Sequence, residues 1–185
     1  MENKEKLFSY DKRIDMIEEI DHLTGPYSKT NFEKLQQAVK KIKAIEHRLE
    51  IKKFPKFYQI DDAYNSNPVG AKGALDVLDM MNGVKVVVTP GMVELGKKEE
   101  YYNKEFGKQI AKVADKVILV GEKKTKPILE GLKEAKFNEK NVQVINDVRE
   151  AYAILNKLDF KKDVYALFEN DLPDMIRCLK GRLHF

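Results

Sequence analysis

Short apolar runs alternate with amphipathic stretches from about residue 57 onward, and this alternation restricts the fold more than any other feature of the chain. The runs are rich in β-branched and aromatic residues and lack strict polar–apolar alternation, which is typical of strands buried on both faces. They lie at residues 57–60, 84–88, 116–120, 142–145 and 164–168.

Apolar residues at three- and four-residue spacing occupy the intervals between these runs and predict helices there. The predicted helices span residues 69–81, 99–114, 126–135, 148–158 and 172–179. Such an alternation favours an α/β fold with right-handed crossovers. We expect a Rossmann-like open, mostly parallel sheet of about six strands with helices on both faces. The additional strand is predicted at 47–51, pairing with 57–60.

The first 45 residues are expected to form a short helical lead-in rather than a second core. Ile14, Ile17 and Ile20 share one stripe, Gly25-Pro26 interrupts it, and a second helix is predicted at 31–43. The lead-in is interpreted as a linker or as the end of a domain that is absent from this chain.

Composition narrows the class of protein further. A chain of 185 residues fits one domain with an appendage, and 34 basic against 30 acidic residues give a net charge of only +4. This even mixing does not favour nucleic acid as a partner. The single cysteine, Cys178, fits a reducing compartment, and no apolar run is long enough to span a bilayer. We expect a cytoplasmic protein without membrane insertion. His22, His47 and His184 lack the spacing of metal ligands, so no metal site is expected.

The segment Gly91–Lys97 matches the spacing G-x-x-x-x-G-K of a phosphate-binding loop and follows a predicted strand. Lys98 stands where such a loop needs Ser or Thr for magnesium, and Glu94 would repel phosphate. Met92 is expected to pack into the protein. The segment is therefore interpreted as a glycine-containing turn at the carboxyl end of a strand, where open α/β sheets bind ligands.

Two further polar segments follow predicted strands. Residues 61–68 read Asp-Asp-Ala-Tyr-Asn-Ser-Asn-Pro, in which Asn67 or Ser66 could cap the next helix and Pro68 could begin it. Capping does not account for the two aspartates or for Tyr64. Residues 169–174 read Glu-Asn-Asp-Leu-Pro-Asp, which could bind an ammonium group or a main chain, or could simply begin a helix at Asp171.

Three motifs together resemble the C-terminal domain of the Mur ligases. They are Glu-His-Arg-Leu-Glu at 46–50, the polar string at 61–68, and Gly-Met-Val-Glu-Leu-Gly at 91–96. The resemblance covers about residues 31–174 and is strongest to the branch that adds D-alanyl-D-alanine to a UDP-N-acetylmuramoyl-tripeptide. It implies that residues 46–185 form a Rossmann-like C-terminal domain of a peptidoglycan-precursor ligase.

The resemblance also implies roles for individual residues. Nucleotide-binding residues would be Arg48, Asp62, Tyr64, Asn65 and Asn67. The residues facing the incoming amino acid or dipeptide would be Gly91, Met92, Glu94, Glu169, Asn170 and Asp171. ATP and magnesium would be held mostly by a central ATPase domain, which this chain lacks, so no complete catalytic set is expected here. The partners implied are that ATPase domain and a UDP-sugar-binding domain, in the same or another chain.

Two departures from the family pattern both fall on the acceptor side. Pro90-Gly91-Met92 replaces the usual Gly-Asp-Met, and residues 169–174 stand where relatives of other branches have a Lys-Gly-type segment. The identity of the incoming amine therefore stays open. Two other functions also stay open: a non-catalytic binding module that acts through a partner protein, and a nucleotide-binding regulator that resembles the ligases by chance.

Overall fold

The computed structural model describes residues 47–64 and 67–170. All of them belong to one compact unit of the chain, Ile45–Phe185. The predicted lead-in and the predicted helix at 172–179 lie outside the described residues, as do two predicted site residues, Asn65 and Asp171. The division of the chain at residues 45 and 46 stays a prediction.

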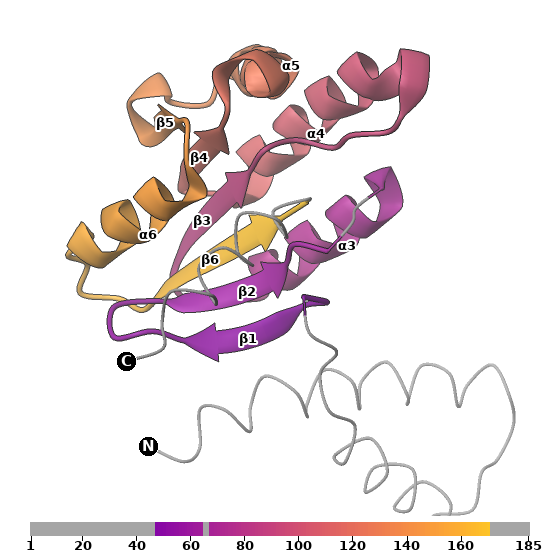
Figure 1. The fold of residues 1–185 in the computed structure, drawn as a ribbon. Helices are drawn as coiled ribbons and strands as arrows, with labels where there is room; N and C mark the ends of the chain where they lie inside the picture. The colour runs from indigo at the N-terminus through magenta and orange to yellow at the C-terminus, as the bar shows by residue number, and fades with distance from the viewer. Residues whose placement is uncertain (1–46, 65–66, 171–185) are drawn as a thin grey trace, which may run out of the picture. The chain divides into compact units, whose positions relative to one another are not determined.

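A six-stranded sheet forms the centre of this unit, with the strand order β1-β2-β6-β3-β4-β5 (Figure 1). Strand β1 is antiparallel to β2, and the other pairs are parallel. This confirms the predicted mostly parallel sheet and the pairing of the additional strand. The strands are β1 Glu50–Lys53, β2 Tyr58–Asp62, β3 Val84–Thr89, β4 Lys116–Val120, β5 Val142–Ile145 and β6 Val164–Glu169.

Helices cover both faces of the sheet, as predicted: α3, α4 and α5 pack on one face and α6 on the other (Figure 1). The α6 face is built around Val86, Ile118 and Phe168, which contact α6 through Ala151 and Leu155. The helices are α3 Pro68–Asp79, α4 Glu99–Val113, α5 Glu122–Glu134 and α6 Val148–Lys157, with short 3₁₀ turns η1 Gly96–Lys98 and η2 Glu139–Asn141.

Helix α5 begins at Glu122, four residues before its predicted start at Lys126, and Pro127 lies inside it. The fixed φ of proline is helical, so within a helix it costs mainly one backbone hydrogen bond and some crowding against the preceding turn. The preceding Gly121 has a φ of 87°, a conformation that glycine adopts without strain. The apolar face of α5 then continues through Ile128 and Leu132, both buried.

Helices α4 and α5 approach each other closely through two glycines. A Cβ built on Gly107 would lie 2.2 Å from the Ile128 carbonyl oxygen, and one built on Gly131 would lie 2.0 Å from that of Lys104. The backbones of the two helices are thus in contact here, and no larger residue fits without moving them apart.

Candidate functional site

The candidate site lies at the carboxyl edge of the sheet, where β2 and β6 end side by side. Asp62, the last residue of β2, pairs in register with Glu169, the last residue of β6. Loops that follow parallel strands at this edge are where open α/β sheets bind ligands. The predicted nucleotide and acceptor residues of these two strands therefore come together, although 107 positions separate them in the sequence.

The side chains of Arg48, which precedes β1, and Tyr64, which follows β2, contact each other close to Asp62. The guanidinium carbon of Arg48 is 5.0 Å from the centroid of the Tyr64 ring, a cation–π arrangement. The backbone N–H of Leu49 donates to Oδ1 of Asp62 at 3.1 Å. These contacts connect the segment before β1 to the end of β2. They bring the Arg48 guanidinium, the Tyr64 ring and the Asp62 carboxyl group close together at the end of the sheet.

The carboxyl group of Asp62 is half-buried, and burial raises its pKa above the ordinary value. The Leu49 N–H, a side-chain hydrogen bond with Glu169 and the charge of Arg48 act in the opposite direction, without cancelling the effect of burial. Asp62 and Glu169 therefore interact through their side chains at the end of the sheet.

Asp61 belongs to a different environment from its neighbour, because successive residues of a strand point to opposite faces. It is 1% exposed, and its Oδ2 accepts from Lys52 Nζ at 2.5 Å and lies 2.9 Å from His47 Nδ1. Burial by itself lowers the pKa of Lys52, but the hydrogen bonds to Asp61 and Glu50 outweigh it and raise that pKa. Asp61 thus holds β1 against β2 and does not face a ligand.

Asn67 caps α3, which confirms one of the two predicted caps. Its Oδ1 accepts from the N–H groups of Val69 and Gly70, both at 3.0 Å, and Pro68 is the first helical residue. This satisfies orphan donors of the first turn. The capping role accounts for the presence of Asn67, so its predicted contact with a nucleotide has no separate structural support.

The loop after β3 is fastened to α4 by Asn103, a residue that the sequence analysis did not identify. Asn103 Oδ1 accepts from Met92 N at 2.8 Å, and its Nδ2 donates to the carbonyl oxygens of Met92 at 2.8 Å and Glu99 at 3.0 Å. The signal was present, because Asn103 is a polar residue on the same helix face as Phe106, Gly107 and Ile110.

Among the predicted acceptor residues of this loop, only Glu94 is exposed, and it has a φ of 63°. Met92 is buried, as expected. Gly91 is also buried, with a φ of 88°, and a Cβ there would lie 2.9 Å from Asn103 Oδ1. Gly91 and Met92 therefore shape the loop from inside.

Glu169 and Asn170 are both buried at the end of β6. Asn170 has a φ of 68°, and neither atom of its side-chain amide has a hydrogen-bond partner among the described residues. A buried amide without partners is costly, so this end of β6 is a polar position that the described residues leave unsatisfied. The register of β3 with β6 places the loop after Thr89 beside this end of β6.

Two kinds of feature are absent from residues 47–64 and 67–170. No three His, Cys, Asp or Glu side chains gather there in a way that could hold a metal ion. None of the helices in that part of the chain is both long and apolar enough to cross a membrane.

Comparisons with known proteins identify the family of this domain. The family model "Mur ligase, glutamate ligase domain" matches residues 47–168. A curated UDP-N-acetylmuramoyl-tripeptide–D-alanyl-D-alanine ligase from Buchnera aphidicola subsp. Acyrthosiphon pisum (strain APS) is 44% identical over 48 residues, which is 26% of this chain and 10% of that enzyme.

Solved structures show the same fold at low sequence identity. MurF from Acinetobacter baumannii matches with a TM-score of 0.65 and 22% identity, over 81% of this chain and 34% of that one. MurF from Thermotoga maritima, solved in complex with ADP, matches with a TM-score of 0.61 and 21% identity, over 76% of this chain and 31% of that one. This chain therefore spans about a third of the length of these enzymes.

The matched family segment begins at the residue before Arg48 and ends at the residue before Glu169, so it contains the sheet, Asp62 and the loop after β3. On this match, together with the fold, the chain belongs to the Mur ligase family, of which it carries the glutamate ligase domain.

Proposed function

We propose that this chain acts as the C-terminal domain of an ATP-dependent amide ligase of peptidoglycan-precursor synthesis. It would contact the nucleotide and cover the acceptor site, while a central ATPase domain in the same or another polypeptide holds most of the ATP and magnesium. The observation that supports this best is the meeting of Arg48, Tyr64 and Asp62 at the carboxyl edge of the sheet.

The chemistry of these side chains suits a bound adenine nucleotide. The guanidinium of Arg48 is permanently charged and exposed, so it can approach phosphate oxygens. A carboxylate such as Asp62 accepts hydrogen bonds from a ribose diol, and the exposed ring of Tyr64 offers a surface for stacking. Asn65 and Asn67 would complete the nucleotide side.

The acceptor side would be formed by the loop at 91–96 and by the end of β6. Gly91 and Met92 would keep the loop in shape, and Glu94 would be its exposed charge. Glu169, Asn170 and Asp171 would face the incoming amine, whether D-alanyl-D-alanine or another amino acid. The family reaction forms an acyl phosphate on a UDP-N-acetylmuramoyl-peptide, and the amine then displaces phosphate.

Phosphoryl transfer needs groups that neutralise the charge of the transferred phosphoryl group. The described residues offer no cluster for a metal ion, so we expect the chain alone to hydrolyse or transfer no phosphate. If the isolated chain turned over ATP in the presence of substrates, the proposal that it needs a separate ATPase domain would be wrong.

Isothermal titration with ADP tests the nucleotide site directly. We expect weak binding that falls at least about fivefold in Asp62→Ala and in Arg48→Ala, since each loses one charged contact. Asp76→Ala is the control, because Asp76 is exposed on α3 and pairs only with Lys72 among the described residues. Binding that Asp62→Ala and Arg48→Ala leave unchanged would refute the site, and no ADP binding together with capture of a partner protein would favour the non-catalytic module.

A further inference from the structure

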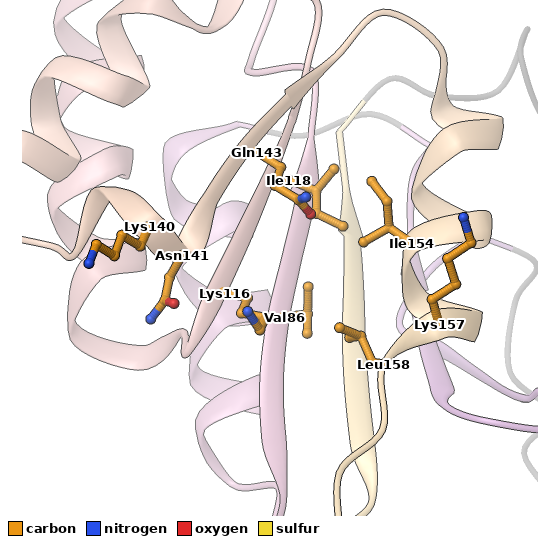
Figure 2. A pocket seen from close by; sticks show the side chains of 9 residues that line it. All are labelled: Val86, Lys116, Ile118, Lys140, Asn141, Gln143, Ile154, Lys157 and Leu158. Carbon is orange, nitrogen blue, oxygen red and sulfur yellow. The ribbon is translucent and has the colours of Figure 1, made fainter.

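A groove of about 390 Å³ lies on the α6 face of the sheet, away from the site described above (Figure 2). Its wall on one side is the last turn of α6, and its floor crosses β3, β4 and β5 near their amino ends. Asp62 and Glu169 lie at the carboxyl ends of their strands, at the opposite edge of the same sheet. The groove is therefore separate from the proposed ligase function.

The uneven covering of the sheet accounts for the groove. Three helices pack on one face, whereas α6 is the only described helix on the other (Figure 1). Neighbouring strands are about 4.8 Å apart, so β3 to β5 span about 10 Å, which is roughly the width of one packed helix or extended segment. Among the described residues, the groove beside α6 is thus about as wide as one segment of polypeptide.

The charge of the groove is of one sign. Lys116, Lys140 and Lys157 contribute ammonium groups from β4, η2 and α6, and none of the described residues that line the groove is acidic. None of the three forms an ion pair with another described residue. Lys116 is only partly exposed, so an acidic group placed beside it would gain more than it would at a fully exposed lysine.

The remaining lining residues suit a peptide better than a small inorganic anion. Asn141 and Gln143 carry amides that can donate to and accept from a peptide main chain. Ile154 near the end of α6 and Leu158 directly after it offer an apolar surface at the other wall (Figure 2). We propose that this groove binds an acidic peptide segment of another protein, one that also presents apolar side chains.

Fluorescence anisotropy with the full 185-residue chain tests the proposal. The probe is a labelled peptide of about twelve residues built from Glu-Glu-Leu repeats, and the matched peptide has Gln in place of every Glu. We expect the acidic peptide to bind at least about tenfold more tightly, and its affinity to fall as salt is raised. The variant Lys116→Gln/Lys157→Gln should bind it about three- to tenfold more weakly.

The control variant is Lys112→Gln/Lys136→Gln, which removes the same charge from exposed lysines outside the groove. It should bind the acidic peptide as the unchanged chain does. Amide chemical shifts in a ¹⁵N-labelled chain should move at Lys116 and Gln143 on adding the peptide. Equal binding of both peptides, equal loss in both variants, shifts confined to the carboxyl edge, or the same shifts with inorganic phosphate alone would each overturn the proposal.

Discussion

Replacing Gly107 by Ala tests the close approach of α4 and α5. The new Cβ would lie 2.2 Å from the Ile128 carbonyl oxygen. Contacts below 3.0 Å are essentially absent from real proteins, so the two helices must move apart by about 0.8 Å at this point. The atom in the way is backbone, which cannot rotate aside as a side chain would.

Two opposing effects set the size of the change. Alanine in place of glycine inside a helix contributes about 1 kcal/mol of stability. Overpacking a filled interface costs about 1–3 kcal/mol, and a backbone partner puts this site at the upper end. We expect Gly107→Ala to lower the free energy of unfolding by about 1–2 kcal/mol. Gly73→Ala is the matched control on α3, where a Cβ meets nothing within 4 Å, and it should raise stability by about 0.5–1 kcal/mol.

Urea unfolding and thermal melting of the full chain measure both variants. One kcal/mol corresponds to about 3 °C in a domain of this size. The melting temperature should therefore fall in Gly107→Ala and rise in Gly73→Ala, and the two variants should differ from each other by about 5–9 °C. If Gly107→Ala were as stable as Gly73→Ala, the inference that the backbones of α4 and α5 are in contact at Gly107 would be refuted.

Three further changes test the site. Asn67→Ala removes the cap of α3 and should cost about 0.5–2 kcal/mol in urea unfolding, whereas Asn67→Ser should restore most of it. Asn103→Leu leaves Met92 N and O without their side-chain partner and should cost about 1–3 kcal/mol, with faster amide exchange at Met92; unchanged exchange would contradict the clamp. Because the pKa of Asp62 is raised in the folded chain, its protonated form favours folding. This contribution is fully present below the ordinary pKa, at about pH 4, and is lost as pH rises through the raised pKa. The chain should therefore lose stability relative to Asp62→Asn over that range, and parallel pH profiles would show that the pKa of Asp62 is not raised in the folded chain.

Much of the fold follows from local patterns. The apolar runs and the amphipathic stretches predict the strands and the four described helices within a few residues, because burial on two faces and burial on one stripe leave different periodicities. Asn67 and Pro68 mark the start of α3 through capping, which involves only neighbouring residues. The predicted start of α5 is four residues too late, because residues 122–126 are polar or charged and add nothing to the apolar spacing from which the helix was predicted.

The candidate site shows the limit of such patterns. Asp61 and Asp62 are chemically identical in the sequence, and only the pairing of β1 with β2 turns one into a buried ion-pair partner and leaves the other at the edge. Asn103 acquires its role from a loop eleven positions away, which folds back onto α4.

The sequence alone determined the alternation of strands and helices and the cap of α3. It also showed that the three motifs resemble those of one family. Each of these features depends on residues that are close together in the chain. Only the tertiary structure placed β6 between β2 and β3, and so brought Glu169 to Asp62. The reason is physical: the connection from β5 to β6 runs through α6 across one face of the sheet, and the apolar side chains buried between α6 and the sheet hold β6 in its central position.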